Sequence, residues 1–101
     1  MSAHDEQSEG YEGTVTVAVD GEPPRTAHAA LAARFDPLAG HVVWTGRVSA
    51  EVPPRTGLLL TTPFGTARAR SVEGDVWGNT RIAGVDRPPF PVELLDGASP
   101  A

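Results

Sequence analysis

Four polar side chains that can bind an anion or move a proton lie on two neighbouring segments: His28, Arg34, Thr45 and Arg47. If they share one face, they would line a barrel mouth, where His28 shuttles a proton and Arg47 holds an enolate or carboxylate. His28 and Arg47 are then the candidate catalytic residues, while Arg34 and Thr45 would contact the ligand. Alternation along a strand equally predicts a solvated outer sheet face, and we favour that simpler interpretation.

The two tryptophans, Trp44 and Trp77, are further candidates for ligand binding, because flat aromatic side chains often wall a pocket. However, this chain has few aromatic residues and needs them to build a core, so we favour a core role for both. Gly46, Gly78 and Gly84 fall within predicted strands, where glycine makes room for a bulge, a corner or a packed aromatic ring.

Other catalytic chemistries find little support. Ser49 and Ser71 lack the nucleophile-elbow pattern of serine hydrolases. His28 and His41, with Asp36, would lie too far apart along a hairpin to share a metal ion. The chain has no cysteine, and all its basic residues are arginine, which excludes thiolate and Schiff-base chemistry. We therefore predict neither a metal nor a cofactor.

The formal net charge is −5, and many of the acids lie at the two ends of the chain: Asp5, Glu6, Glu9, Glu12 and Asp96. Between residues 13 and 95 acids balance arginines, so no basic face is available to bind a nucleic acid. The N-terminus lacks a basic start followed by an apolar run, and no segment reaches membrane-spanning length. We expect a cytoplasmic protein with no membrane partner.

The polar face depends on a β-hairpin that the sequence predicts over residues 26–49, with a loop at 37–40. Alternate side chains of a strand share a face, so the correct register should place apolar residues opposite one another. One register does so, with Phe35 opposite Val42, Ala33 opposite Trp44, Leu31 opposite Gly46 and Ala29 opposite Val48. All four polar candidates then lie on the other face.

The alternation of three valines predicts a strand at residues 13–19. A turn at 20–24 would place Val17 opposite Ala27 and Val15 opposite Ala29, which completes a three-stranded meander.

The alanine-rich stretch from Ala27 to Phe35 also suits a helix. We favour a strand, because the flanking strands need a neighbour and so short a helix is marginal.

Turn signals at regular spacing predict further strands at 57–62, 66–72, 76–85 and 92–95. Two prolines interrupt the chain at 51–56, where it should cross to the other side of the fold. The continuous apolar run at 57–62 predicts a strand covered on both faces, and an oligomer contact would be the cover if the fold supplies none.

These features predict a single all-β domain: a small antiparallel β-barrel of six to seven strands over residues 11–95, between disordered tails at 1–10 and 96–101. A β-sandwich is the alternative. We expect a rigid, aromatic-anchored turn at 86–91, pinned by ion pairs of Arg81 and Arg87 with Asp75 or Asp86.

Several spaced motifs resemble one known family: Tyr11-Glu12-Gly13, Phe35-Asp36-Pro37, Trp44-Thr45-Gly46-Arg47, Trp77-Gly78 and Arg87-Pro88-Pro89-Phe90-Pro91. Over about residues 10–92 the chain resembles a small actinobacterial domain of unknown function that occurs alone or fused to the C-terminus of flavin-dependent monooxygenases. The resemblance implies a place beside oxidative, often specialised, metabolism, and it brings no catalytic residues. This chain carries no dinucleotide-binding glycine motif, so it is not the flavin-binding part.

Three functions follow as hypotheses. The first is a small-molecule-binding barrel of specialised metabolism, with a cofactor-free cyclase or isomerase as its catalytic form. The second is a non-catalytic accessory module that docks on a flavin-dependent oxygenase, and the third is a self-associating domain such as a homodimer. We rank the first slightly ahead, because small barrels readily enclose a ligand such as a biosynthetic intermediate. A filled core with a broad apolar surface around Leu58 to Leu60 would favour the other two.

Overall fold

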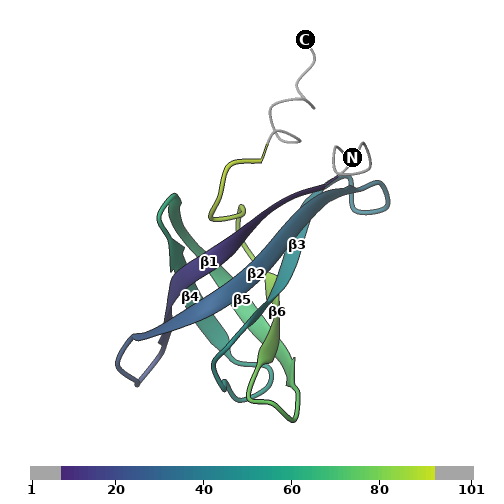
Figure 1. The fold of residues 1–101 in the computed structure, drawn as a ribbon. Helices are drawn as coiled ribbons and strands as arrows, with labels where there is room; N and C mark the ends of the chain where they lie inside the picture. The colour runs from purple at the N-terminus through teal and green to yellow at the C-terminus, as the bar shows by residue number, and fades with distance from the viewer. Residues whose placement is uncertain (1–7, 93–101) are drawn as a thin grey trace.

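The computed structural model describes residues 8–92, which form a closed antiparallel β-barrel of six strands without a helix (Figure 1). The strands are β1 (Ser8–Val19), β2 (Arg25–Asp36), β3 (His41–Val48), β4 (Gly57–Thr62), β5 (Gly65–Gly74) and β6 (Thr80–Gly84). Their order around the barrel is β1-β2-β3-β6-β5-β4, so two three-stranded meanders meet along two seams, β1 with β4 and β3 with β6. The predicted all-β barrel is confirmed.

The central hairpin of β2 and β3 has the predicted register. Phe35 lies opposite Val42, Ala33 opposite Trp44, Leu31 opposite Gly46 and Ala29 opposite Val48. β2 is a strand throughout, because its odd-numbered residues from 27 to 33 are buried against the opposite side of the barrel while its even-numbered neighbours face solvent. Tertiary burial thus overrides the helix propensity of the alanines.

The pairing of β1 with β2 differs from the prediction by two residues, since Ala27 lies opposite Val15 rather than Val17. Both registers keep the valines on the inner face, so the apolar pattern does not distinguish them. The turn decides between them: the amide of Glu22 donates to the carbonyl oxygen of Val19 at 2.9 Å, and the two prolines that follow cannot donate to a ladder.

Several strand boundaries also differ from the prediction. The strand expected at 76–85 extends only from Thr80 to Gly84, because residues 75–79 form a hairpin turn. β1 begins at Ser8, inside the stretch predicted to be a tail. Val92 pairs with no strand, and the rest of the expected closing strand lies outside the described residues, as do residues 1–7 and 96–101. No described segment forms a helix that could cross a membrane.

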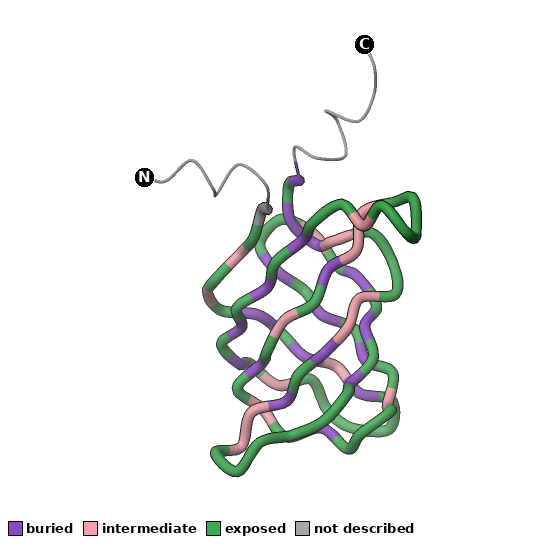
Figure 2. The backbone as a smooth tube through the Cα atoms, turned by 90° about the vertical axis from the view of Figure 1, so that its right-hand side faces the viewer, coloured by how far each residue is buried: buried purple, intermediate pink, exposed green. Residues whose placement is uncertain are grey.

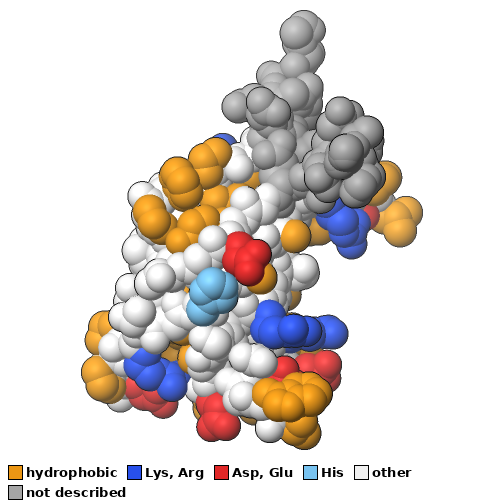
Figure 3. All heavy atoms as spheres, in the orientation of Figure 1, with side chains coloured by type: hydrophobic (Ala, Val, Ile, Leu, Met, Phe, Trp, Pro, Cys, Tyr) orange, Lys and Arg blue, Asp and Glu red, His pale blue; other side chains and the backbone are white. Residues whose placement is uncertain are grey.

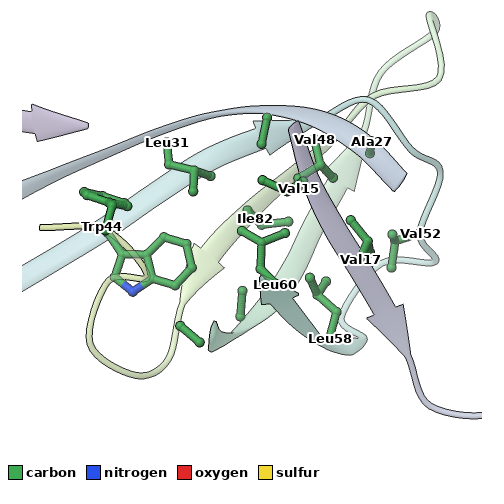
Figure 4. Close-up of a cluster of buried hydrophobic side chains, with 14 of the residues drawn as sticks. Val15, Val17, Ala27, Leu31, Trp44, Val48, Val52, Leu58, Leu60 and Ile82 are labelled. Carbon is green, nitrogen blue, oxygen red and sulfur yellow. The ribbon is translucent and has the colours of Figure 1, made fainter. Parts of the chain in front are cut away.

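Apolar side chains fill the interior, because buried and exposed positions alternate along the strands (Figure 2). Figure 4 shows side chains from β1, β2, β3, β4 and β6 meeting there, among them Val15, Leu31, Val48, Leu60 and Ile82.

β4 follows the same alternation as its neighbours, so the prediction of a strand covered on both faces is wrong. Leu58 and Leu60 are buried, but Leu59 points outward and is 43% exposed. A continuous apolar run therefore marks one buried face here, not two.

The turn at 86–91 lies at the upper end of the barrel in Figure 1, and Trp44, which is only 2% exposed, packs beside this turn. Its indole lies on Gly84, where an added Cβ would come within 2.1 Å of the ring. Phe90 meets it edge-on, with 6.5 Å between ring centroids, and the indole Nε1 donates to the carbonyl oxygen of Asp86 at 2.7 Å. The core role of Trp44 and the aromatic-anchored turn at 86–91 are both confirmed.

Buried hydroxyl groups hold the irregular segments that cover the two ends of the barrel. The Thr62 hydroxyl donates to the carbonyl oxygen of Pro89 at the upper end. At the lower end the Ser71 hydroxyl donates to the carbonyl oxygen of Pro53. The Thr80 hydroxyl donates to the carbonyl oxygen of Ala50 at 2.7 Å and accepts from the amide of Val52 at 3.1 Å. These side chains satisfy backbone groups that no strand can reach.

The Thr80→Val variant should lose about 1–3 kcal/mol of unfolding free energy, because two backbone groups near the core are left without partners while the side-chain shape is kept. Urea unfolding measures the loss. The matched control is Thr61→Val, whose hydroxyl bonds, among the described residues, only to Thr66 at the surface, and it should stay within about 0.5 kcal/mol of the wild type. Equal losses in the two variants would contradict the assigned role of Thr80.

Candidate functional site

The polar face predicted from the hairpin lies on the outside of the barrel. His28, Thr45 and Arg47 line an open groove of about 800 Å³ over β2, β3 and β6. Arg34 is not part of this groove; with Thr45 it borders a separate hollow of about 100 Å³. The structure thus brings three of the four polar candidates together, and it places them in solvent rather than in a lumen.

Small side chains form the floor of this outer groove. In the pairing of β2, β3 and β6, Ala30 lies opposite Arg47, and Thr45 lies opposite Ala83. Between Ser71 and Glu73 the register of β5 shifts, so that the side chains of both Val72 and Glu73 are exposed. A bulge of this kind redirects side chains at the edge of a site.

The charges of the groove are partly paired. His28 Nε2 lies 3.6 Å from a carboxylate oxygen of Glu12, and Arg81 pairs with Glu73 at 3.6 Å. Arg47 lies directly opposite Arg81 across β3 and β6, an arrangement of like charges that destabilises a sheet. Within residues 10–92 no carboxylate lies at ion-pair distance from Arg47, although its charge acts on the carboxylate of Asp75 in the neighbouring turn.

The hairpin turn between β5 and β6 borders the groove and carries Trp77. Its neighbouring hollow, of about 220 Å³, is lined by Trp77 together with Arg47, Asp75, Asn79 and Arg81. Trp77 is 81% exposed, so the prediction of a core role for this residue is wrong. Figure 3 shows hydrophobic side chains at the lower end of this face, with acidic and basic groups beside them.

Asp75 holds this turn in one conformation. One carboxylate oxygen accepts from the amides of Trp77 at 2.8 Å and Asn79 at 3.0 Å, and the other accepts from the Asn79 side chain at 3.2 Å. Gly78, which was expected inside a strand, lies in the turn with a φ of 87°, a value that glycine adopts without strain. The Asp-x-x-Gly-Asn stretch is a turn signal in the sequence, and it overlaps the strand expected at 76–85 because apolar residues flank it.

The pKa of Asp75 is lowered, most by the backbone amide of Asn79, and further by the amide of Trp77 and the charge of Arg47. A folded-state pKa below the unfolded one means that the turn gains stability above the ordinary aspartate pKa of about 3.9 and loses it as the pH falls through the lowered pKa. The protection of the Trp77 and Asn79 amides, taken relative to the exchange rate of an unfolded peptide at the same pH, should therefore be lost only below the ordinary titration range of aspartate. In Asp75→Asn this acid transition should disappear, and its persistence would contradict the assignment.

The remaining predictions concern the ion pairs of Asp86, the role of Ser49 and a metal site. Asp86 pairs with Arg68 at 3.4 Å, so the expected partners Arg81 and Arg87 are wrong for this residue. The Ser49 hydroxyl accepts from the amide of His28 and belongs to the hairpin. Between residues 8 and 92 no three histidine, aspartate or glutamate side chains gather as metal ligands.

An open groove with exposed charged groups suits binding better than catalysis, because acid–base chemistry gains most where water is excluded. Fold and site define a small, closed, antiparallel barrel with a filled interior and a polar groove on its outer surface. The chain belongs to the family described as "Domain of unknown function (DUF4873)", whose model matches residues 8–92. Comparisons with curated proteins and with solved structures gave no match.

Proposed function

We propose that this protein is a non-catalytic binding module that attaches to a partner protein through the outer groove and the Trp77 turn. The observation that carries the proposal is the exposure of Trp77 on a turn that Asp75 holds in place. A solvent-exposed tryptophan beside arginines is a typical anchor residue of a protein interface. On binding it buries a large surface area and loses little side-chain conformational entropy.

The filled interior supports the same choice. A ligand inside the barrel would have to displace side chains such as Val17 and Leu60, which are fully buried. The residues with useful chemistry face outward, where a partner can reach them directly. The flavin-dependent oxygenase implied by the sequence resemblance is the partner to test first.

The test is a titration of this chain with such an oxygenase. Calorimetry measures the binding, and iodide quenching of tryptophan fluorescence measures how far the tryptophans stay exposed to solvent. Iodide reaches the exposed Trp77 but not the buried Trp44, so quenching of this chain reports on the turn, and the oxygenase measured alone supplies the correction for its own tryptophans. Binding with Trp77 protected from iodide is the expected result. Binding that leaves the quenching unchanged would contradict the proposed surface, and the absence of binding would contradict the oxygenase as partner.

A small-molecule ligand in the same groove is the second candidate, favoured by the joint presence of Arg47, His28 and Thr45 around a floor of small residues. This function corresponds to the ligand-binding protein of specialised metabolism, with the cyclase or isomerase as its catalytic form. A carboxylate or enolate would bind to Arg47. A screen of carboxylate-bearing compounds, read by chemical-shift changes at Arg47 and Thr45, separates this function from the first.

A further inference from the structure

The barrel is closed along only part of β1. β1 pairs with β4 from Thr16 to Val19, whereas its pairing with β2 continues back to Ser8. Between Ser8 and Thr14 the other side of β1 therefore has no strand beside it among the described residues. Figure 1 shows β1 and β2 running on together toward the upper right, away from β4.

Hydrogen bonds of the neighbouring strand show which backbone groups face this open side. The carbonyl oxygen of His28 accepts from the amide of Ser49, and the amide of His28 donates to the Ser49 hydroxyl, so both groups point toward β3. Thr14, which lies opposite His28, must then direct its own amide and carbonyl away from β2. Gly10 and Glu12 share this direction by the two-residue period of a strand.

The open edge is long enough to pair with another strand. The amides of Gly10 and Glu12 have no backbone partner within residues 8–92, and only the carbonyl oxygen of Thr14 is covered, by the Tyr11 hydroxyl at 2.7 Å. All three edge residues are exposed. Exposed strand edges of this kind accept an added strand from another chain.

The chemistry around the edge indicates what kind of strand fits. Residues 8–15 carry two glutamates and no arginine, and the carboxylate of Glu12 lies on the outer face at the centre of the edge. Two copies of this acidic edge would repel one another. Beside the edge, Phe64 is 62% exposed and stacks edge-on against Tyr11, with 6.1 Å between ring centroids.

We propose that the open edge of β1 from Gly10 to Thr14 binds an extended basic segment of a partner protein by strand addition. Backbone hydrogen bonds would form with Gly10, Glu12 and Thr14. Basic side chains of the segment would lie near Glu12, and its apolar side chains would cover Phe64. The open edge adjoins the outer groove at the Glu12–His28 pair but is separate from the Trp77 turn, so the amide of Trp77 reports on the function proposed above independently of the edge.

The experiment titrates the protein with a blocked peptide of alternating arginine and valine and follows amide hydrogen exchange. We expect the amides of Gly10, Glu12 and Thr14 to become protected by about tenfold, while that of Trp77 does not change. Two results would overturn the proposal: these amides exchange as before at saturating peptide, or they are already protected in the free protein by its own chain or a second copy.

Two substitutions at one position separate the backbone from the charge. Glu12→Pro removes an amide that faces the open edge, leaves the β1–β2 ladder intact and should abolish peptide binding. Glu12→Gln keeps the amide and should weaken binding by only about threefold. Circular dichroism confirms that both variants fold. Equal binding by Glu12→Pro and the wild type would overturn the proposal, and so would complete loss of binding in Glu12→Gln.

Discussion

The Trp44→Ala variant should lose about 3–5 kcal/mol of unfolding free energy, a large part of the stability expected for a domain of this size. The substitution removes the indole that fills the upper end of the barrel, its hydrogen bond to Asp86 and its contact with Phe90. The turn at 86–91 should then detach, because its anchor is gone. Chemical denaturation followed by circular dichroism measures the stability, and amide exchange at Phe90 reports on the turn.

A double-mutant cycle with Gly84 shows whether the loss comes from this particular contact. Gly84→Ala alone should cost about 1–3 kcal/mol, because its Cβ would overlap the indole ring and force Trp44 to move. In the Trp44→Ala background the same change should cost little, since the space is already empty. Costs that simply add would mean that Trp44 and Gly84 do not constrain one another, which would contradict the contact between the indole ring and Gly84.

The Trp77→Ala variant should bind the partner protein about 30- to 100-fold more weakly than the wild type, which corresponds to an anchor residue worth about 2–3 kcal/mol. The fold should be unaffected, because the side chain is exposed and the turn depends on backbone bonds to Asp75. Calorimetric titration measures the affinity, and the melting temperature should stay within about 1 °C of the wild-type value.

The control for this experiment is Leu38→Ala. Leu38 is 98% exposed at the turn between β2 and β3, at the opposite end of the barrel. It therefore tests whether any large apolar residue in solvent contributes to binding. Equal losses in the two variants would point to non-specific hydrophobic association, and an unchanged affinity in Trp77→Ala would remove the turn from the interface.

Sequence patterns predicted the fold well where apolar residues had to meet in pairs. The register of β2 and β3 followed from matching Phe35 with Val42 and Ala33 with Trp44, because a shift by one residue would turn every apolar side chain outward. A shift by two residues keeps the same face inward, which is why the β1–β2 register was missed. Only the local geometry of the turn at Val19 to Glu22 settles it.

The sequence predicts part of the candidate site but not all of its residues. His28, Thr45 and Arg47 do lie together, because alternation alone places them on one face. The residue type of Trp77 favours a place in the core. The type alone does not show that the carboxylate of Asp75 holds this residue in an exposed turn. Arg81 reaches the site across the β3–β6 seam, a pairing between distant segments that no local pattern shows.

The two seams of the barrel also bear on how the chain folds. Each meander consists of hairpins between neighbours in the sequence, whereas the β1–β4 and β3–β6 pairs join distant segments. Hairpins close quickly, but strands that are distant in the sequence pair only after the chain has lost the entropy of closing a long loop. Refolding should therefore be slow for a domain of this size, on the order of milliseconds to seconds. Until both seams close, each meander exposes apolar side chains and unpaired edges. Molecules that meet in this interval risk aggregation, which makes seam closure the step at which nascent chains are most vulnerable.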